Sequence, residues 1–428
     1  MSVSDLAIVS ALIFIWATLS ARLERFDVTA PITFILAGLL LTHGPLAPLG
    51  YMPSNGLVKT LAEATLVLVL FSDASRVGLR DLRTDMGLCI RLLAIGLPLT
   101  IGLGTLIALP VVGTANPWLA LLVGAALAPT DAALGAGMMV NPAVPVRIRR
   151  LINVESGLND GIATPFVLIA LAALGSSGHA AGIGPAEAAA ELALGIAVGA
   201  VVGGVGGYLV KVASDRGWVA GSFAGSAVLA LAISAYACSL ALHGNGFIAA
   251  FVGGLAYRAA GGERGERMVP FVEETSALVS LLVWLAFGAV AVVPAFESLT
   301  WPDVLYAVLS LTLIRMVPVA VALTRARLGR TTVAFIGWFG PRGLASVVFA
   351  LLALEDLGGK AATPAVAVIS MTVLLSVIAH GISAEPLARR YAAALSRTTA
   401  GPAHAGRPEL PARKLIRHPA ALPGRRAE

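Results

Sequence analysis

Charged residues are scarce in this sequence: only 13% of its 428 residues are Asp, Glu, Lys or Arg. Soluble globular domains average about a quarter charged residues, because a surface in water needs them. Aromatic residues make up 6%, and the two cysteines, Cys89 and Cys238, lie inside apolar runs. This cysteine usage argues against a disulfide framework and against a structural zinc site. The Walker motif for ATP binding is also lacking.

Apolar residues make up 57% of the chain, and 46 positions are Gly. A helix needs about 20 mostly apolar residues to cross a bilayer core, and small residues let such helices pack closely in lipid. We predict an all-α polytopic membrane protein with about 13 transmembrane helices. The predicted spans are Leu6–Leu23, Thr29–Thr42, Leu57–Ser72, Met86–Val112, Trp118–Val140, Leu151–Leu174, Ala188–Val212, Trp218–Leu242, Gly246–Ala259, Val269–Val292, Val304–Thr324, Thr331–Leu352 and Pro364–Leu387.

The placement of Lys and Arg predicts the orientation of these spans. With the N-terminus outside, 25 of the 30 basic residues fall in cytoplasmic loops and the tail, two fall outside, and three lie inside apolar runs. Cytoplasmic loops of membrane proteins carry such an excess of basic residues. We therefore expect a multi-pass protein of the cell (inner) membrane with an external N-terminus and a cytoplasmic C-terminus. The net charge of +6 is explained in this way and does not indicate binding to nucleic acid.

The composition changes near residue 393. Residues 1–392 contain all the predicted spans and form one predicted transmembrane domain. Residues 393–428 are rich in Pro, Arg and Ala and show no apolar periodicity. Such a segment cannot bury enough apolar surface to fold, so we predict a basic, disordered cytoplasmic tail.

Six ionisable residues are interpreted as lying at bilayer depth, where a charge costs at least ~2.5–3.5 kcal/mol and therefore marks a candidate functional site. They are Asp73, Asp131, Glu155, Asp160, Arg315 and Arg342. Arg91, Glu273 and Glu274 lie close to span ends and are expected at the membrane interface, and His380 is interpreted as a packing residue.

The fifth and sixth spans contain most of the polar chemistry. The fifth contains Ala128-Pro129-Thr130-Asp131, and its proline should interrupt the helix and free backbone carbonyls as cation ligands. The sixth contains Glu155-Ser156-Gly157-Leu158-Asn159-Asp160-Gly161. Ser156 and Asp160 are four residues apart and share one helix face, and Glu155 and Asn159 share the neighbouring face. Such a set of oxygen atoms suits an alkali cation.

The twelfth span contains Gly340-Pro341-Arg342-Gly343, a second predicted interruption. The fifth and twelfth spans are seven apart, so they run in opposite directions through the membrane. Two interrupted helices of opposite sense are typical of inverted repeats. We predict that spans one to six and eight to thirteen form the two repeats, linked by the seventh.

These motifs, in this order, resemble the monovalent cation/proton antiporters of the NhaP type. The resemblance covers roughly residues 5–392 and includes Thr130-Asp131, the Glu155–Asp160 segment, an arginine in span eleven and Gly340–Gly343. Phe71-Ser72-Asp73 resembles a further element, although many members have Glu at the acidic position. The resemblance implies a homodimer with a mobile core bundle that carries the ion.

The resemblance also implies residue roles. Asp160 would be the main cation and proton site, Ser156 would supply its hydroxyl and Thr130 its carbonyl, and Asp131 would act directly or through water. Asp73 would be a further ligand, although it is one carbon shorter than Glu. Asn159 would orient the site and Glu155 would pair with Arg315, with Arg342 as the alternative partner. Arg342 would balance Asp131 or brace the interrupted helix.

The predicted function is exchange of Na⁺, Li⁺ or K⁺ for H⁺, without a cofactor and without enzymatic chemistry. A buried carboxylate can be neutralised by a proton or by a cation, so the two ions compete for one site and move in opposite directions. Because residue 159 is Asn and cannot titrate, we expect electroneutral exchange. A K⁺/H⁺ antiporter of the same fold, a cation channel and a membrane-embedded hydrolase are the alternatives. A channel would need a filter of backbone carbonyls, and the sequence contains no such filter motif. A hydrolase would need a base for Ser156, and no His lies near it in the sequence.

Overall fold

A computed structural model of the chain describes residues 3–23, 28–51, 53–76, 86–139, 141, 144–175 and 185–397. All regular elements in these ranges are helical, as predicted. The α-helices are α1 (Val3–Leu23), α2 (Ala30–His43), α3 (Asn55–Arg76), α4 (Met86–Arg91), α5 (Leu97–Val111), α6 (Pro117–Ala126), α7 (Ala136–Met139), α8 (Val146–Gly175), α9 (Pro185–Asp215), α10 (Gly221–Ala241), α11 (Gly246–Glu266), α12 (Pro270–Val290), α13 (Val292–Glu297), α14 (Trp301–Leu311), α15 (Leu313–Ala322), α16 (Arg330–Trp338), α17 (Leu344–Leu357) and α18 (Gly359–Arg397). Short segments of other helix types are η2 (Ala47–Leu49), η4 (Leu92–Gly96) and η5 (Ala132–Gly135).

Within the described residues, eight helical segments are long and apolar enough to cross a bilayer. They are Val3–Leu23, Met86–Val111, Val146–Gly175, Ala189–Asp215, Gly221–Ala241, Pro270–Val290, Trp301–Ala322 and Ala362–Leu395. The outward-facing side chains agree with a lipid environment, since Phe14 is 69% exposed, Phe223 71% and Ile233 51%. A soluble monomer rarely exposes so much contiguous apolar surface. The chain is therefore a multi-pass membrane protein.

Several predicted limits differ from the structure. The ninth span does not end at Ala259, because α11 continues to Glu266 through a kink at Gly262, whose φ of 60° suits glycine. The eleventh span is divided into α14 and α15 at Thr312. The last helix continues to Arg397, beyond the predicted boundary at residue 392. The remainder of the predicted tail, residues 398–428, lies outside the described residues.

Helix starts follow local sequence signals. Pro117 and Pro270 occupy first-turn positions, where the missing N–H has no intrahelical partner to lose. Asn245 caps α11 by accepting the N–H of Ile248 at 3.0 Å. Thr300 and Asp303 form a reciprocal capping box at α14. These caps satisfy helix ends that water would otherwise have to solvate.

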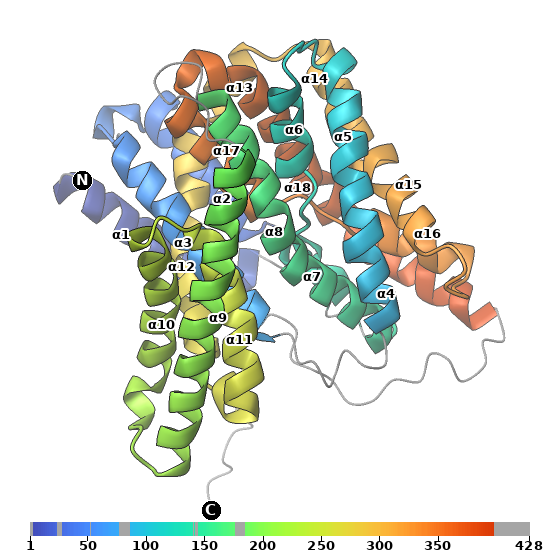
Figure 1. The fold of residues 1–428 in the computed structure, drawn as a ribbon. Coiled ribbons are helices and arrows are strands. Elements are labelled where there is room, and N and C mark those ends of the chain that lie inside the picture. The colour runs from blue at the N-terminus through green and yellow to red at the C-terminus, as the bar shows by residue number, and fades with distance from the viewer. Residues whose placement is uncertain are drawn as a thin grey trace, which may run out of the picture.

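The helices pack in two groups. In the first group, α9 packs on α10 and α11. Helix α3 packs on α11 and α12, and α12 also packs on α2. In the second, α6 packs on α5 and α8, and α18 packs on α14 and α17. Figure 1 shows α9, α10 and α11 on the opposite side of the molecule from α4, α5, α15 and α16. Helices α3 and α11 connect the groups, because both contact α8.

A row of glycines brings α9 and α11 into close contact. Gly195, Gly199, Gly203 and Gly207 recur every fourth residue on one face of α9. A Cβ atom at Gly203 would lie 2.1 Å from the carbonyl oxygen of Gly253 on α11. Backbones approach this closely in membranes where both helices present small residues.

We predict that Gly203→Ala lowers the thermal unfolding midpoint, because the added methyl group forces α9 away from α11 at a cost of about 1–3 kcal/mol. Gly204→Ala is the matched control, since a Cβ at Gly204 would meet nothing within 4 Å. The control should be neutral or stabilising. Thermal unfolding of the purified variants in detergent measures the difference. Equal midpoints for the two variants would contradict the close contact.

Candidate cation site

The first interruption lies between α6 and η5. Helix α6 ends at Ala126, and residues 127–131 leave the helical conformation before η5 begins at Ala132. Pro129 has no N–H to donate to the preceding turn, which accounts for the break. Backbone carbonyls of the last α6 turn therefore need other partners.

The second interruption, residues 339–343 between α16 and α17, lies against the first. The N–H of Asp131 donates to the carbonyl of Pro341 at 2.7 Å, which joins the two breaks directly. A Cβ at Gly343 would lie 2.4 Å from the Cβ of Asp131, so glycine is required for this approach. The two breaks thus form a crossing inside the helix bundle.

Two charged side chains cap the helix ends at this crossing. Asp131 accepts the N–H of Ala133 at 2.9 Å and the N–H of Leu344, the first residue of α17, at 3.3 Å. Arg342 donates to the carbonyl oxygen of Ala128 at 2.5 Å and to that of Pro129 at 3.3 Å. A carboxylate is stabilised by the partial positive charge at a helix N-terminus, and a cation by the partial negative charge at a helix C-terminus. Of the two predicted roles of Arg342, these contacts support bracing the interrupted helix.

Thr130, Ser156 and Asn159 form a hydrogen-bonded cluster beside the crossing. Asn159 accepts the backbone N–H of Thr130 at 3.2 Å and donates to Thr130 Oγ1 at 2.8 Å. Thr130 Oγ1 lies 2.9 Å from Ser156 Oγ. Asn159 thus fixes both the backbone and the side chain of Thr130 against α8. Asp160, the next residue on α8, is buried with 7% of its surface exposed.

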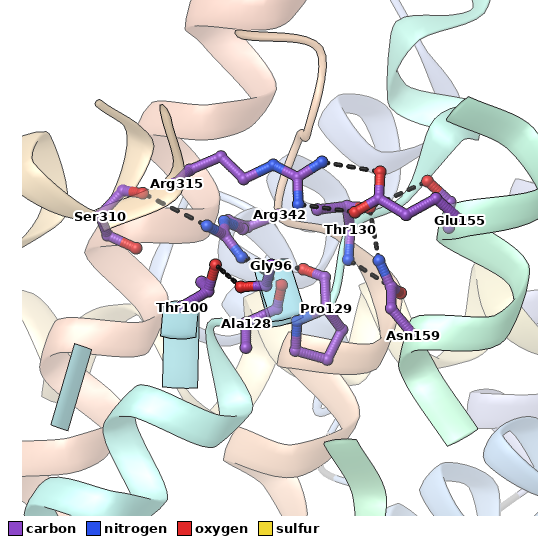
Figure 2. Close-up of polar contacts among 11 residues, drawn as sticks. Gly96, Thr100, Ala128, Pro129, Thr130, Glu155, Asn159, Ser310, Arg315 and Arg342 are labelled. Atoms are coloured by element: carbon purple, nitrogen blue, oxygen red, sulfur yellow. Dashed lines mark hydrogen bonds and ion pairs between the residues drawn. The ribbon is translucent and has the colours of Figure 1, made fainter. Parts of the chain in front are cut away.

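Glu155 and Arg315 form the predicted ion pair. The carboxylate accepts from Arg315 Nη1 at 2.6 Å and from Nη2 at 2.7 Å, a bidentate geometry that is stronger than a single contact. Both side chains are almost completely buried. Figure 2 shows Arg315 and Arg342 from one side of the crossing and Thr130, Asn159 and Glu155 from the other. Gly340 makes room for the pair, since a Cβ there would lie 2.5 Å from Arg315 Nε.

Comparison with known proteins identifies the family of the chain. The family model described as "Sodium/hydrogen exchanger, transmembrane" matches residues 8–390. The chain belongs to the sodium/hydrogen exchanger family. Its fold resembles that of the sodium proton antiporter MjNhaP1 from Methanocaldococcus jannaschii, with a TM-score of 0.73 and 19% identity over 91% of this chain and 98% of that one. A second structure of MjNhaP1 gives a TM-score of 0.70 at the same identity and coverage.

Curated relatives match a shorter part of the exchanger. Uncharacterised Na⁺/H⁺ exchangers of Mycobacterium bovis and Mycobacterium tuberculosis are 32% identical over 167 residues. The match covers 38% of this chain and 28% of each relative. The family and the fold are those of transporters that exchange cations for protons.

Asp73, the remaining predicted ligand of this exchanger, lies near the end of α3. It packs against α8 at Gly157, where an added Cβ would lie 3.3 Å from the Cβ of Asp73. The structure therefore brings α3 to the residue that follows Ser156. This contact places Asp73 beside the polar segment of α8 without assigning it a ligand role.

Some polar contacts in the helix bundle were not expected from the sequence. Glu63 lies inside the third predicted span, and its carboxylate accepts from the hydroxyl of Tyr236 on α10 at 3.3 Å. Because Glu63 is an acid inside an apolar run, the sequence alone could have indicated that it needs a polar partner. Glu273, which is expected at the membrane interface, forms a half-buried ion pair with Arg76 of α3. Arg91 does lie at a helix end, where it donates to the carbonyl of Thr324 at 2.8 Å.

We predict that Glu155→Ala and Arg315→Ala each lower the stability of the exchanger. Removing one partner of a buried pair leaves an uncompensated charge and typically costs ~3–5 kcal/mol. The matched control is Glu385→Ala, which removes one partner of the exposed Arg389–Glu385 pair on α18. Exposed pairs contribute at most about 1 kcal/mol, so its unfolding midpoint should hardly move.

Thermal unfolding and yield of the purified variants test this assignment. A double variant, Glu155→Leu with Arg315→Met, should recover part of the stability, because it leaves no buried charge. If Glu155→Ala is as stable as wild type but inactive in transport, the residue belongs to the ion site and the structural assignment fails.

Proposed function

We propose that this exchanger moves Na⁺ in exchange for H⁺, with Li⁺ or K⁺ as alternative cations, across the cell membrane. The observation that carries the proposal is the position of Asp160, which lies buried on α8 next to the Thr130–Ser156–Asn159 cluster at the crossing of two interrupted helices. Family membership and the antiporter fold support the same function. No ATP motif occurs in the sequence, so an existing ion gradient drives the exchange.

In the proposed site, Asp160 binds either the cation or the proton. Ser156 supplies its hydroxyl and Thr130 its backbone carbonyl, with Asp131 and Asp73 as further oxygen ligands or partners of bound water. Asn159 organises these groups, because both ends of its amide bind Thr130. Oxygen donors of this kind suit a hard monovalent cation, which is the substrate of the protein and not a resident metal.

Alternating access follows from the cost of a buried charge. An isolated carboxylate in a medium of low dielectric constant is expensive to keep ionised without a partner. Protonation removes that charge, and a bound cation balances it. A carrier that reorients only in these two states couples inward movement of one ion to outward movement of the other.

We propose a topology of 13 spans in two inverted repeats, with the N-terminus outside, the C-terminus in the cytoplasm, and assembly as a homodimer. Each of α6–α7 and α16–α17 counts as one interrupted span, and α4–α5 and α14–α15 each count as one. The repeats are supported by the position of the two interruptions, which pack against each other. The distribution of basic residues supports the orientation.

We predict that addition of NaCl to energised vesicles dequenches a pH-sensitive dye when wild-type protein is present. Asp160→Asn should abolish this response while the protein still inserts and folds, since Asn cannot carry the exchanged proton. Asp131→Asn should be severely impaired as well. LiCl, KCl and choline chloride establish the selectivity and provide the control. Wild-type rates from monodisperse Asp160→Asn protein would refute the assignment of Asp160.

We also predict electroneutral exchange of one cation for one proton. Asn159 cannot titrate, and the two N–H groups that bind Asp131 provide partners for its charge whether or not a cation is present. Only Asp160 then alternates between H⁺ and Na⁺, and the loaded carrier has the same charge in both directions. The membrane potential, worth ~2.3 kcal/mol per charge per 100 mV, does no net work on it.

Proteoliposomes with a fixed Na⁺ gradient and a potential clamped by K⁺ and valinomycin test the stoichiometry. The zero-flux point should depend on the pH and Na⁺ gradients alone. Movement of that point with the potential would show that more than one proton is exchanged per cation.

A further inference from the structure

His380 of α18 is buried, with 1% of its surface exposed, and both ring nitrogens contact polar groups. Nδ1 lies 3.2 Å from Ser376 Oγ and 2.9 Å from the Ser376 carbonyl oxygen. Nε2 lies 2.9 Å from the carbonyl oxygen of Trp338. The Trp338 ring packs on the imidazole with centroids 5.2 Å apart. These contacts are more specific than the packing role expected from the sequence.

The partners of His380 and Ser376 are the two ends of the second interruption. Trp338 is the last residue of α16, and Arg342 lies just before α17. The N–H of Arg342 donates to Ser376 Oγ at 2.7 Å. Helix α18 therefore holds one end of the 339–343 segment through Ser376 and the other end through His380, one turn later.

Two of these hydrogen bonds have a direction fixed by the groups involved. The N–H of Arg342 donates to Ser376 Oγ. Because the carbonyl oxygen of Trp338 can only accept, His380 Nε2–H donates to it.

The 339–343 segment in turn places the residues of the proposed cation site. Pro341 accepts the N–H of Asp131 at 2.7 Å. Gly340 lies against Thr130, since a Cβ there would be 3.1 Å from Thr130 Cγ2. A shift of this segment would therefore move Thr130 and Asp131 relative to Ser156 and Asp160.

We propose that His380 and Ser376 are positioning residues for cation binding, acting through the 339–343 segment. This inference rests on the proposed function. It predicts a selective effect, because the cation needs the oxygen atoms near the crossing, whereas a proton needs only the Asp160 carboxylate. Loss of the hydrogen bonds from Ser376 and His380 should therefore reduce cation affinity without reducing proton affinity.

The test measures Na⁺-driven exchange in proteoliposomes for Ser376→Ala and His380→Leu as a function of Na⁺ concentration and pH. The half-saturating Na⁺ concentration should rise about tenfold or more, with a maximal rate within about threefold of wild type. At a fixed Na⁺ concentration, the pH of half-maximal exchange should move upward by about one unit, because the proton competes against a more weakly bound cation.

Two further variants separate positioning from packing. His380→Gln retains a donor that can reach the Trp338 carbonyl and should restore much of the affinity, while His380→Asn should not. Thr372→Val is the matched control, since Thr372 is equally buried on α18 but its hydroxyl donates to its own helix at Val368, at 2.7 Å. Its Na⁺ dependence should remain that of wild type.

Unchanged half-saturation and pH profile in folded Ser376→Ala would overturn the inference. Loss of maximal rate and thermal stability together, with unchanged affinity, would also overturn it and assign a packing role. Ser376→Ala removes a single hydroxyl and decides the question if His380→Leu does not fold. Absence of exchange by the wild-type protein would instead refute the proposed function.

Discussion

The crossing of the two interrupted helices is the interaction on which the rest of the site depends. An interruption inside a bilayer exposes carbonyl and N–H groups that lipid cannot satisfy, so it persists only where protein partners replace the lost bonds. Here Arg342 binds the carbonyls of Ala128 and Pro129 in the first interruption, and Asp131 accepts the first N–H of α17. Each broken helix supplies the charge that stabilises the end of the other. This mutual dependence holds Thr130 and Asp131 next to α8.

Electrostatic roles are divided among the buried charges. Glu155 and Arg315 neutralise each other through two short contacts and lie apart from transport in this account. Arg342 binds the backbone carbonyls of Ala128, in the first interruption, and of Ser310 on α14. Asp160 is the acid that we propose alternates between a proton and a cation.

Part of this organisation was predictable from the sequence. Pro129 and Pro341 marked the two interruptions, since proline removes a hydrogen-bond donor wherever it occurs. Helix periodicity turns Glu155 away from Ser156 and Asp160, and a buried acid needs a base, so a basic partner was predictable; the family resemblance favoured Arg315 over Arg342. The family resemblance supplied the roles of Asp73 and Asn159, which spacing alone does not assign.

Other features depend on tertiary contacts that no local signal reveals. No proline occurs at Thr312, yet the chain leaves the helix there and the carbonyl of Ser310 binds Arg342. Glu63 and Glu273 find partners on α10 and α3, and which helices become neighbours is decided by the packing of the whole bundle. His380 differs from an ordinary packing residue only because α18 passes both ends of the second interruption.

The central claim is that one carboxylate holds either one proton or one cation. The most direct measurement is the number of protons released when Na⁺ binds to the purified protein in weakly buffered detergent solution, followed with a pH indicator beside a determination of bound Na⁺. The account predicts one proton per Na⁺ for the wild type and no release from Asp160→Asn. Two protons per Na⁺, or unchanged release from Asp160→Asn, would contradict it.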